Sequence, residues 1–136
     1  MTAKEYLSSA QDMERLLNAK RRMLKKLQAQ STSLSSVKMG DRIKSSGGSS
    51  TAVIDKIIDL EAEILARENE LIEKQKEIMH KIQLVYNPKL IAVLIDKDIN
   101  GMSIEQIAEA MDISRRTACV WNGQALQIFR KETGLK

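Results

Sequence analysis

Apolar side chains recur at helical spacing along two long stretches of the chain. In the first, Thr2 and Glu5 have the spacing of a capping box, and an apolar stripe continues to about Gln30 with one interruption at Lys20. In the second, residues 51–86, apolar residues recur at near-heptad spacing while Glu and Lys cover the other faces. A long helix with a narrow apolar stripe needs a partner, so we expect the two helices to pair as an antiparallel, coiled-coil-like hairpin.

The stretch between these helices, residues 31–50, contains eight serines and three glycines. This composition is typical of a flexible connector, because it offers little to bury. The few apolar residues within it are able to dock on the helices: Leu34, Val37, Met39 and Ile43. The expected hairpin and its connector together occupy residues 1–86.

Residues 87–101 have the pattern of a shorter, densely apolar helix. Asn87 suits its N-cap and Pro88 its first helical position, and Asn100-Gly101 is a strong stop signal. This helix is expected to support the two helices that follow it.

Residues 103–131 have the pattern of two helices joined by a tight turn. Ser103 and Gln106 have capping-box spacing, and Ser114 is a good N-cap for the second helix. Asp112 occupies a turn position that often requires a left-handed backbone, which Asp tolerates. The expected buried residues are Ile104, Ile107, Ala108, Met111, Ala118, Trp121, Ala125, Leu126 and Phe129, with Ile113 closing the turn. This is the pattern of a helix-turn-helix.

The expected fold is therefore all-α. An N-terminal antiparallel helical hairpin is followed by a three-helix domain that contains the helix-turn-helix and occupies residues 87–136. An aromatic content of 3%, a charged content of 29% and a single proline fit long helices with thin cores.

In a helix-turn-helix that binds DNA, the second helix lies in the major groove with its N-terminal residues toward the bases. The exposed start of that helix is here Arg115, Arg116 and Thr117. Arginine binds guanine through two hydrogen bonds or binds phosphate, and threonine binds either more weakly. Helical hairpins that never touch DNA share this pattern, so the pattern alone leaves both interpretations open.

The run MDISRRTACVWNGQALQIFRK resembles region four, the carboxy-terminal DNA-reading region, of sigma-70 family factors. Ala125-Leu126 and Arg130-Lys131 match the end of that region. The resemblance implies that Arg115, Arg116, Cys119 and Val120 face the groove. The family usually has polar or charged side chains where Cys119 and Val120 stand, and Gly123 weakens the helix by about 1 kcal/mol relative to Ala. The candidate DNA-binding residues are Ser114, Arg115, Arg116, Thr117, Cys119 and Val120.

The chain as a whole is similar to small phage and prophage proteins of Gram-positive bacteria that are grouped with ArpU and RinA type late-transcription regulators. The similarity rests on the start, MTAKEYLSSAQDMERL, and on VIDKIIDLEAEI in the second long helix. It implies regulation of phage late genes.

Charge is distributed unevenly along the chain. Residues 1–50 carry ten basic and four acidic side chains, residues 51–86 five and eight, and residues 87–136 seven and six. Because the expected DNA-binding domain is nearly neutral, we expect it to act as a homodimer through the long helices or beside RNA polymerase. The basic cluster Lys20–Lys26 has two interpretations: it pairs with the acidic second helix, or it contacts phosphate.

Nothing in the sequence predicts catalysis or a cofactor. It has no glycine-rich phosphate loop, no paired carboxylates in an apolar setting and no nucleophile with a positioned base. Cys119 is the only cysteine and His80 the only histidine, so no metal site is expected. There is no apolar run long enough to span a bilayer and no leader-like amino terminus, so we expect a cytoplasmic protein.

The leading hypothesis is a sequence-specific DNA-binding transcriptional regulator that reads double-stranded DNA with helix 114–131. The first alternative is a protein-interaction adaptor with a degenerate helix-turn-helix, which Gly123, Val120 and the weak local charge favour. The second is a packaging-associated protein whose DNA binding is insensitive to sequence. Competition with random DNA separates this last class from the first.

Overall fold

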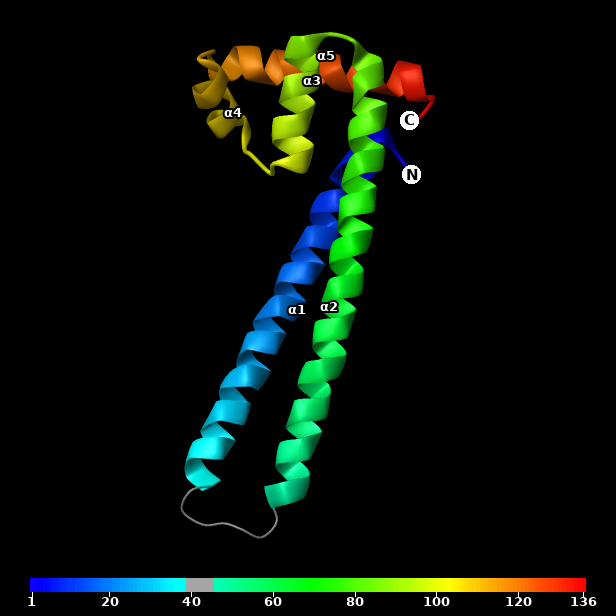
Figure 1. Ribbon diagram of the computed structural model, residues 1–136. Helices are drawn as coiled ribbons and strands as arrows, with labels where there is room; N and C mark the ends of the chain where they lie inside the picture. Colours follow the sequence, from blue (N-terminus) through cyan, green and yellow to red (C-terminus); the bar gives the residue numbers. More distant parts are fainter. Residues whose placement is uncertain (39–45) are drawn as a thin grey trace. The chain divides into compact units, whose positions relative to one another are not determined.

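The computed structural model describes the backbone of residues 1–38 and 46–136, and the side chains of residues 1–32 and 51–136. Within these ranges the chain is helical and contains no strand, which confirms the predicted all-α class. The elements follow in the order α1 (Ala3–Lys38), α2 (Ser46–Ile82), the 3₁₀ turn η1 (Gln83–Val85), α3 (Pro88–Leu94), the π-helical turn η2 (Ile95–Ile99), α4 (Ile104–Met111) and α5 (Arg115–Thr133) (Figure 1).

Helix enters the predicted connector, residues 31–50, from both sides. α1 continues to Lys38 and α2 begins at Ser46. Once a helix is nucleated, each added residue gains a backbone hydrogen bond, so serines of moderate helix propensity extend it. Residues 39–45, including Met39 and Ile43, lie outside the described residues, and so do the side chains of Leu34 and Val37.

The chain forms two compact units. Residues 1–13 and 71–136 make one, which we call the terminal unit, and residues 14–70 make the other, which we call the hairpin unit. The sequence pattern had placed the boundary after residue 86. In the structure, the first turns of α1 and the last turns of α2 instead belong to the same unit as α3, α4 and α5.

The hairpin unit pairs the α1 and α2 segments along one apolar seam. Leu17 of α1 and Leu60 and Ile64 of α2 are buried in this unit. The Nζ atom of Lys20 lies 3.0 Å from a carboxylate oxygen of Glu63. A second ion pair crosses between the helices at 3.3 Å, from Arg21 to Glu68. Two residues of the predicted basic cluster therefore pair with the acidic helix.

The terminal unit has a core to which α3, α4 and α5 all contribute. Its fully or nearly buried members are Val93 from α3, Ile107 and Ala108 from α4, and Ala118 from α5. Five half-buried side chains pack against them: Met102, Ile104, Met111, Ile113 and Trp121. Ile113 thus closes the turn as predicted, and Trp121 packs on the core rather than standing free. The Lys89 ammonium lies over the Trp121 ring, 4.9 Å from its centre.

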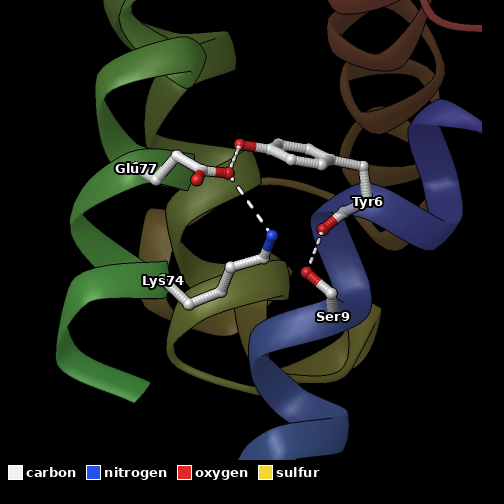
Figure 2. Close-up of polar contacts among 4 residues, drawn as sticks. All are labelled: Tyr6, Ser9, Lys74 and Glu77. Atoms are coloured by element: carbon white, nitrogen blue, oxygen red, sulfur yellow. Dashed lines mark hydrogen bonds and ion pairs between the residues drawn. The ribbon is translucent and has the colours of Figure 1, made fainter. Parts of the chain in front are cut away.

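Tyr6 ties the first turns of α1 into this unit. Its hydroxyl donates a hydrogen bond to Glu77 Oε2 of α2 at 2.5 Å, and Lys74 Nζ lies 3.4 Å from the same oxygen (Figure 2). Ser9 Oγ donates to the Tyr6 carbonyl at 2.6 Å, one turn along α1 (Figure 2). The Tyr6 ring stacks on Phe129 of α5 with the ring centres 6.2 Å apart. The amino-terminal turns therefore contact the helix that carries the candidate site.

These contacts perturb both ionisable groups. Burial raises the pKa of the Tyr6 hydroxyl, and the hydrogen bond to Glu77 raises it further. The Tyr6 hydrogen bond lowers the pKa of the Glu77 carboxyl, and the bond from Lys74 adds to that effect. Glu77 is thus held in its charged form where it accepts both bonds.

Candidate nucleic-acid interface

The turn between α4 and α5 is fixed by a capping box and by a left-handed residue. The amide of Gln106 donates to Ser103 Oγ at 3.2 Å, and the Ser103 amide donates to Gln106 Oε1 at 2.8 Å. Asp112 ends α4 with φ 55° and ψ 49°, the left-handed conformation expected from the sequence. The Ile113 amide then donates to the Ala108 carbonyl at 2.9 Å. The start of α5 is therefore held in a defined position relative to α4.

The start of α5 is capped by Ser114. Its Oγ accepts a hydrogen bond from the Thr117 amide at 3.0 Å and donates one to Thr117 Oγ1 at 2.8 Å. Two of the six candidate DNA-binding residues thus serve the cap. Because Thr117 Oγ1 accepts the bond from Ser114, its own O–H is left as a donor at the exposed end of the helix.

The two candidate arginines follow the cap directly and are both exposed. Arg115 Nε donates to Glu105 Oε1 at 2.8 Å, although the two side chains are 67% and 62% exposed. This hydrogen bond raises the pKa of Arg115 and lowers that of Glu105. Arg116 has no ion-pair partner among the residues that the structure describes. The two neighbours therefore differ: one guanidinium is held by a carboxylate and the other is not.

Cys119 and Val120 continue the exposed face of α5 one turn further on. Val120 is 48% exposed, so its apolar side chain is open to solvent on this face. Beyond them, the Cα of Gly123 faces open space, so a side chain would fit there. The same helix buries Ala118, Ala125 and Phe129. The structure thus brings the six candidate residues together at the start of one helix, five of them exposed and Thr117 half-buried.

Sequence reasoning did not assign Glu105 to this site. The pattern placed it only on the solvent face of the first helix of the pair. Glu105 and Arg115 are ten positions apart in the sequence and lie on different helices. Helical periodicity relates residues of one helix, so it does not predict this contact. The position of the carboxylate becomes visible only when α4 and α5 are oriented.

A second feature of the terminal unit is a buried carboxylate next to a cavity. Asp98 of η2 is 5% exposed, and burial raises its pKa, while Lys97 at 3.9 Å acts in the opposite direction. Asp98 and Lys97 line a cavity of about 390 Å³ together with Thr2, Lys4, Glu5 and Ser8 of the amino-terminal turns. Gln11 donates a side-chain hydrogen bond to the Lys97 carbonyl. The lining contains two basic and two acidic side chains, so it favours neither sign of charge.

The described residues offer neither a metal-binding cluster nor a membrane-spanning helix. Among the described side chains, those of residues 1–32 and 51–136, there is no group of three or more His, Cys, Asp or Glu that could hold a metal ion. None of the helices in these ranges combines the length and the apolar character that crossing a bilayer requires.

Comparisons with known proteins return one match. A family model described as "Protein of unknown function (DUF1492)" matches residues 33–129, more than two thirds of the 136 residues. The matched range includes the whole of the candidate interface. No curated protein and no solved structure matches the chain.

Proposed function

We propose that this chain, which belongs to the DUF1492 family, is a sequence-specific DNA-binding transcriptional regulator that reads the major groove with residues 114–131. The observation that carries the proposal is the pair of exposed arginines at the capped start of α5, where a short, fixed turn presents them to solvent. Guanidinium groups at the N-terminal end of the second helix are the side chains that bind guanine and phosphate in this geometry. No catalytic activity is proposed.

Each candidate residue has a role that its chemistry supports. Arg116 is free to bind phosphate or guanine, and Arg115 presents the part of its guanidinium that Glu105 does not occupy. The Thr117 hydroxyl donates to a phosphate oxygen. Val120 contacts a thymine methyl group, and Cys119 is a small neutral side chain that lets the helix approach the bases. Ser114 holds the turn through its cap.

The charge of the domain and the surface of the hairpin unit support the proposal of a homodimer. Residues 87–136 carry a net charge of only +1, which supports few phosphate contacts per chain. Ile54, Ile58 and Leu65 lie on α2 at spacings of four and seven residues, and they are 47%, 57% and 61% exposed. Such a stripe is typical of a helix that packs on another helix. We propose that a second copy covers it, with RNA polymerase as the other candidate partner.

We also propose which genes the protein regulates and where in the cell it acts. The similarity to ArpU and RinA type regulators supports a role in the transcription of phage or prophage late genes. DNA and RNA polymerase are in the bacterial cytoplasm, and we propose that the protein acts there.

The proposal is tested by DNA binding of the purified full chain. Fragments covering its genome neighbourhood are offered at low and at physiological salt against excess random DNA. We expect one fragment to survive competition, and replacement of Arg116 by Ala to weaken its binding roughly 10- to 100-fold, the scale of one arginine contact to a base. Replacement of both Arg115 and Arg116 is expected to abolish specific binding. Because both side chains are exposed, the melting temperature should fall by no more than about 3 °C.

A matched control removes one arginine from the other end of the same helix. Arg130 lies in the last turn of α5 and is exposed. Arg130→Ala changes the net charge by the same amount and lies outside the six candidate DNA-binding residues, so it reports the electrostatic effect without loss of a candidate base contact. Retention of the selected fragment by the Arg115→Ala, Arg116→Ala double variant would contradict the proposal.

Two other results select the alternatives. The exposed Val120 and the near-neutral charge of residues 87–136 favour an adaptor that binds protein. Absence of DNA binding at low salt, together with a stable protein partner, would select it. Binding that random DNA displaces as well as any fragment does would select a packaging-associated protein.

A further inference from the structure

The ion pair between Glu105 and Arg115 gives one of the two arginines a fixed orientation. We infer that Glu105 is a positioning residue that makes Arg115 discriminate between DNA sequences, an inference that rests on the proposed DNA-binding function. Glu105 does not itself bind DNA in this account. It acts through the guanidinium that it holds.

The geometry of the contact determines which edge of the guanidinium stays available. Glu105 Oε1 accepts from Nε at 2.8 Å, and this is the contact that joins the two side chains. A guanidinium has five N–H donors, one on Nε and four on the two terminal nitrogens. With Nε occupied, the edge made by Nη1 and Nη2 remains for a bidentate contact. That edge fits the O6 and N7 acceptors of guanine.

Both partners stand on backbone that is fixed independently. Glu105 lies in the first turn of α4, inside the capping box that joins Ser103 and Gln106. Arg115 is the first residue of α5, directly after the Ser114 cap. The contact therefore spans the turn between two capped helix starts. An arginine held in this way loses less side-chain freedom on binding than a free one.

The carboxylate also changes what Arg115 contributes to binding that is independent of sequence. A paired guanidinium carries little net charge toward a phosphate, and the Glu105 carboxylate repels phosphates nearby. Arg116 has no such partner among the described residues. Arg115 held by Glu105 thus supplies mainly discrimination, whereas Arg116 supplies attraction to any DNA in addition to its own contact with phosphate or guanine.

The test compares three variants of the full chain in binding to the selected fragment and to random DNA. Glu105→Ala removes both the charge and the acceptor, and Glu105→Gln keeps an acceptor oxygen without the charge. Glu109→Ala is the matched control, because Glu109 is an exposed carboxylate on the same helix that makes no ion pair with Arg115. The quantity compared is the ratio of the two dissociation constants, measured at several salt concentrations.

We expect every variant to bind random DNA more tightly, by roughly 2- to 10-fold at low salt, because each loses one negative charge. Only Glu105→Ala should lower the specificity ratio strongly, by roughly tenfold or more, the scale of one bidentate base contact. Glu105→Gln should lose less of that ratio. A purely electrostatic role for Glu105 would instead make all three variants alike.

A measurement on the free protein checks the geometry separately. The Nε–H resonance of Arg115 in ¹⁵N nuclear magnetic resonance should shift in Glu105→Ala and stay in place in Glu109→Ala. An unchanged resonance, or an equal specificity ratio for Glu105→Ala and Glu109→Ala, would overturn the inference and leave DNA binding intact. Failure of the unmodified chain to prefer any fragment would instead overturn the proposed function and this inference together.

Discussion

The terminal unit and the hairpin unit are both made of helices, yet they bury apolar side chains to very different extents. Among the side chains that the structure describes, seven of the eight largest fully buried ones belong to the terminal unit, and the eighth, Leu17, belongs to the hairpin unit. The seven are Phe129, Leu7, Ile78, Ile82, Leu94, Ile107 and Val93. Among the described side chains of the hairpin unit, five large apolar residues are 45% to 61% exposed: Leu16, Met23, Ile54, Ile58 and Leu65. The terminal unit, with many more described residues, also exposes five: Met1, Ile72, Met79, Tyr86 and Val120.

The difference follows from how many helices each unit combines. Two helices meet along a single seam, so each residue has apolar neighbours on one side only. Helices that cross in several directions enclose a core, and their side chains are covered from all sides. The candidate site therefore stands on a framework with a closed core. The hairpin unit, by contrast, offers apolar surface that another chain could cover.

The largest expected effect is the loss of the buried aromatic ring of Phe129 in the terminal unit. Phe129 is fully buried and stacks on Tyr6. Phe129→Ala removes that stacking and leaves a cavity, which should cost about 3 to 5 kcal/mol of unfolding free energy. Chemical denaturation measures the total loss of unfolding free energy. Amide hydrogen exchange shows which helices lose protection, and we expect faster exchange in α3, α4 and α5.

The neighbouring Ile128 provides the control, since it is half-buried on the same helix. Ile128→Ala should cost clearly less than Phe129→Ala. Equal costs for the two variants would mean that burial does not distinguish the two faces of α5, and the contrast between the units would lose its basis.

The local signals in the sequence predicted the capped helix starts and the turn correctly, whereas α2, which was expected from residue 51, begins at Ser46. The capping boxes at Thr2 and Ser103, the cap at Ser114 and the left-handed Asp112 are all present. The cap at Asn87 is also present, with its side chain accepting from the Lys89 amide at 3.1 Å. These features depend on residues at most three or four positions apart, so a sequence pattern contains them.

Contacts between distant residues could not be predicted in this way. Tyr6 reaches Glu77 across 71 positions, and its ring meets Phe129 from the other end of the chain. The Glu105–Arg115 pair depends on the angle between two helices. The π-helical turn that buries Asp98 also gave no signal, because an apolar run followed by Asn-Gly predicts a regular helix with a simple stop. Tertiary packing, and not local preference, decides each of these cases.

The second prediction compares two adjacent leucines in the hairpin unit. Leu17 is 1% exposed and Leu16 is 45% exposed. Leu17→Ala should cost about 2 to 4 kcal/mol, with faster amide exchange in residues 14–32 and 51–70. Leu16→Ala should cost less than about 0.5 kcal/mol in the monomer, as an exposed substitution does.

The Leu16 variant also sharpens the proposal of a homodimer. If Leu16→Ala proves as costly as Leu17→Ala, the outer face of α1 is covered in solution. Both variants are then measured across a range of protein concentration to find what covers this face. A loss of unfolding free energy that depends on protein concentration indicates a second copy of the chain.

The third prediction concerns the buried carboxylate of the terminal unit. Burial raises the pKa of Asp98 above its value in the unfolded chain, so the protonated form favours folding. Its contribution is fully present below the unfolded pKa, about 3.9, and is lost as the pH rises through the folded pKa. Asp98→Asn removes the ionisable group. It should raise the melting temperature by roughly 2 to 4 °C at pH 7 and by less as the pH falls toward 4.

Glu132→Gln serves as the control, because Glu132 is an exposed carboxylate of the same unit. The difference between it and the unmodified chain should not grow between pH 4 and pH 7. A gain from Asp98→Asn that is the same at both ends of this range would show that the charge of Asp98 is not the source of the effect.

The smallest effect is expected at the ion pair that links the two helices of the hairpin unit. The hydrogen bond from Lys20 is the largest cause of the lowered pKa of Glu63, and Arg67 lowers it further. Lys20→Gln should therefore raise the Glu63 pKa toward its ordinary value, which a carboxyl titration by nuclear magnetic resonance measures directly. Any stability that the pair adds is present above the unfolded pKa and lost as the pH falls through the folded pKa.

Because Glu63 is in contact with water, the melting temperature should change by no more than about 1 °C at neutral pH, and less at high salt. Arg22→Gln is the matched control, since Arg22 belongs to the same basic cluster, is exposed and has no ion-pair partner among the described side chains. It should leave the Glu63 titration unchanged. A fall of several degrees for Lys20→Gln alone would mean that ion pairing, and not the seam of Leu17, Leu60 and Ile64, holds the hairpin unit together. The two units would then differ in the type of interaction that stabilises them, and not in how much apolar surface they bury.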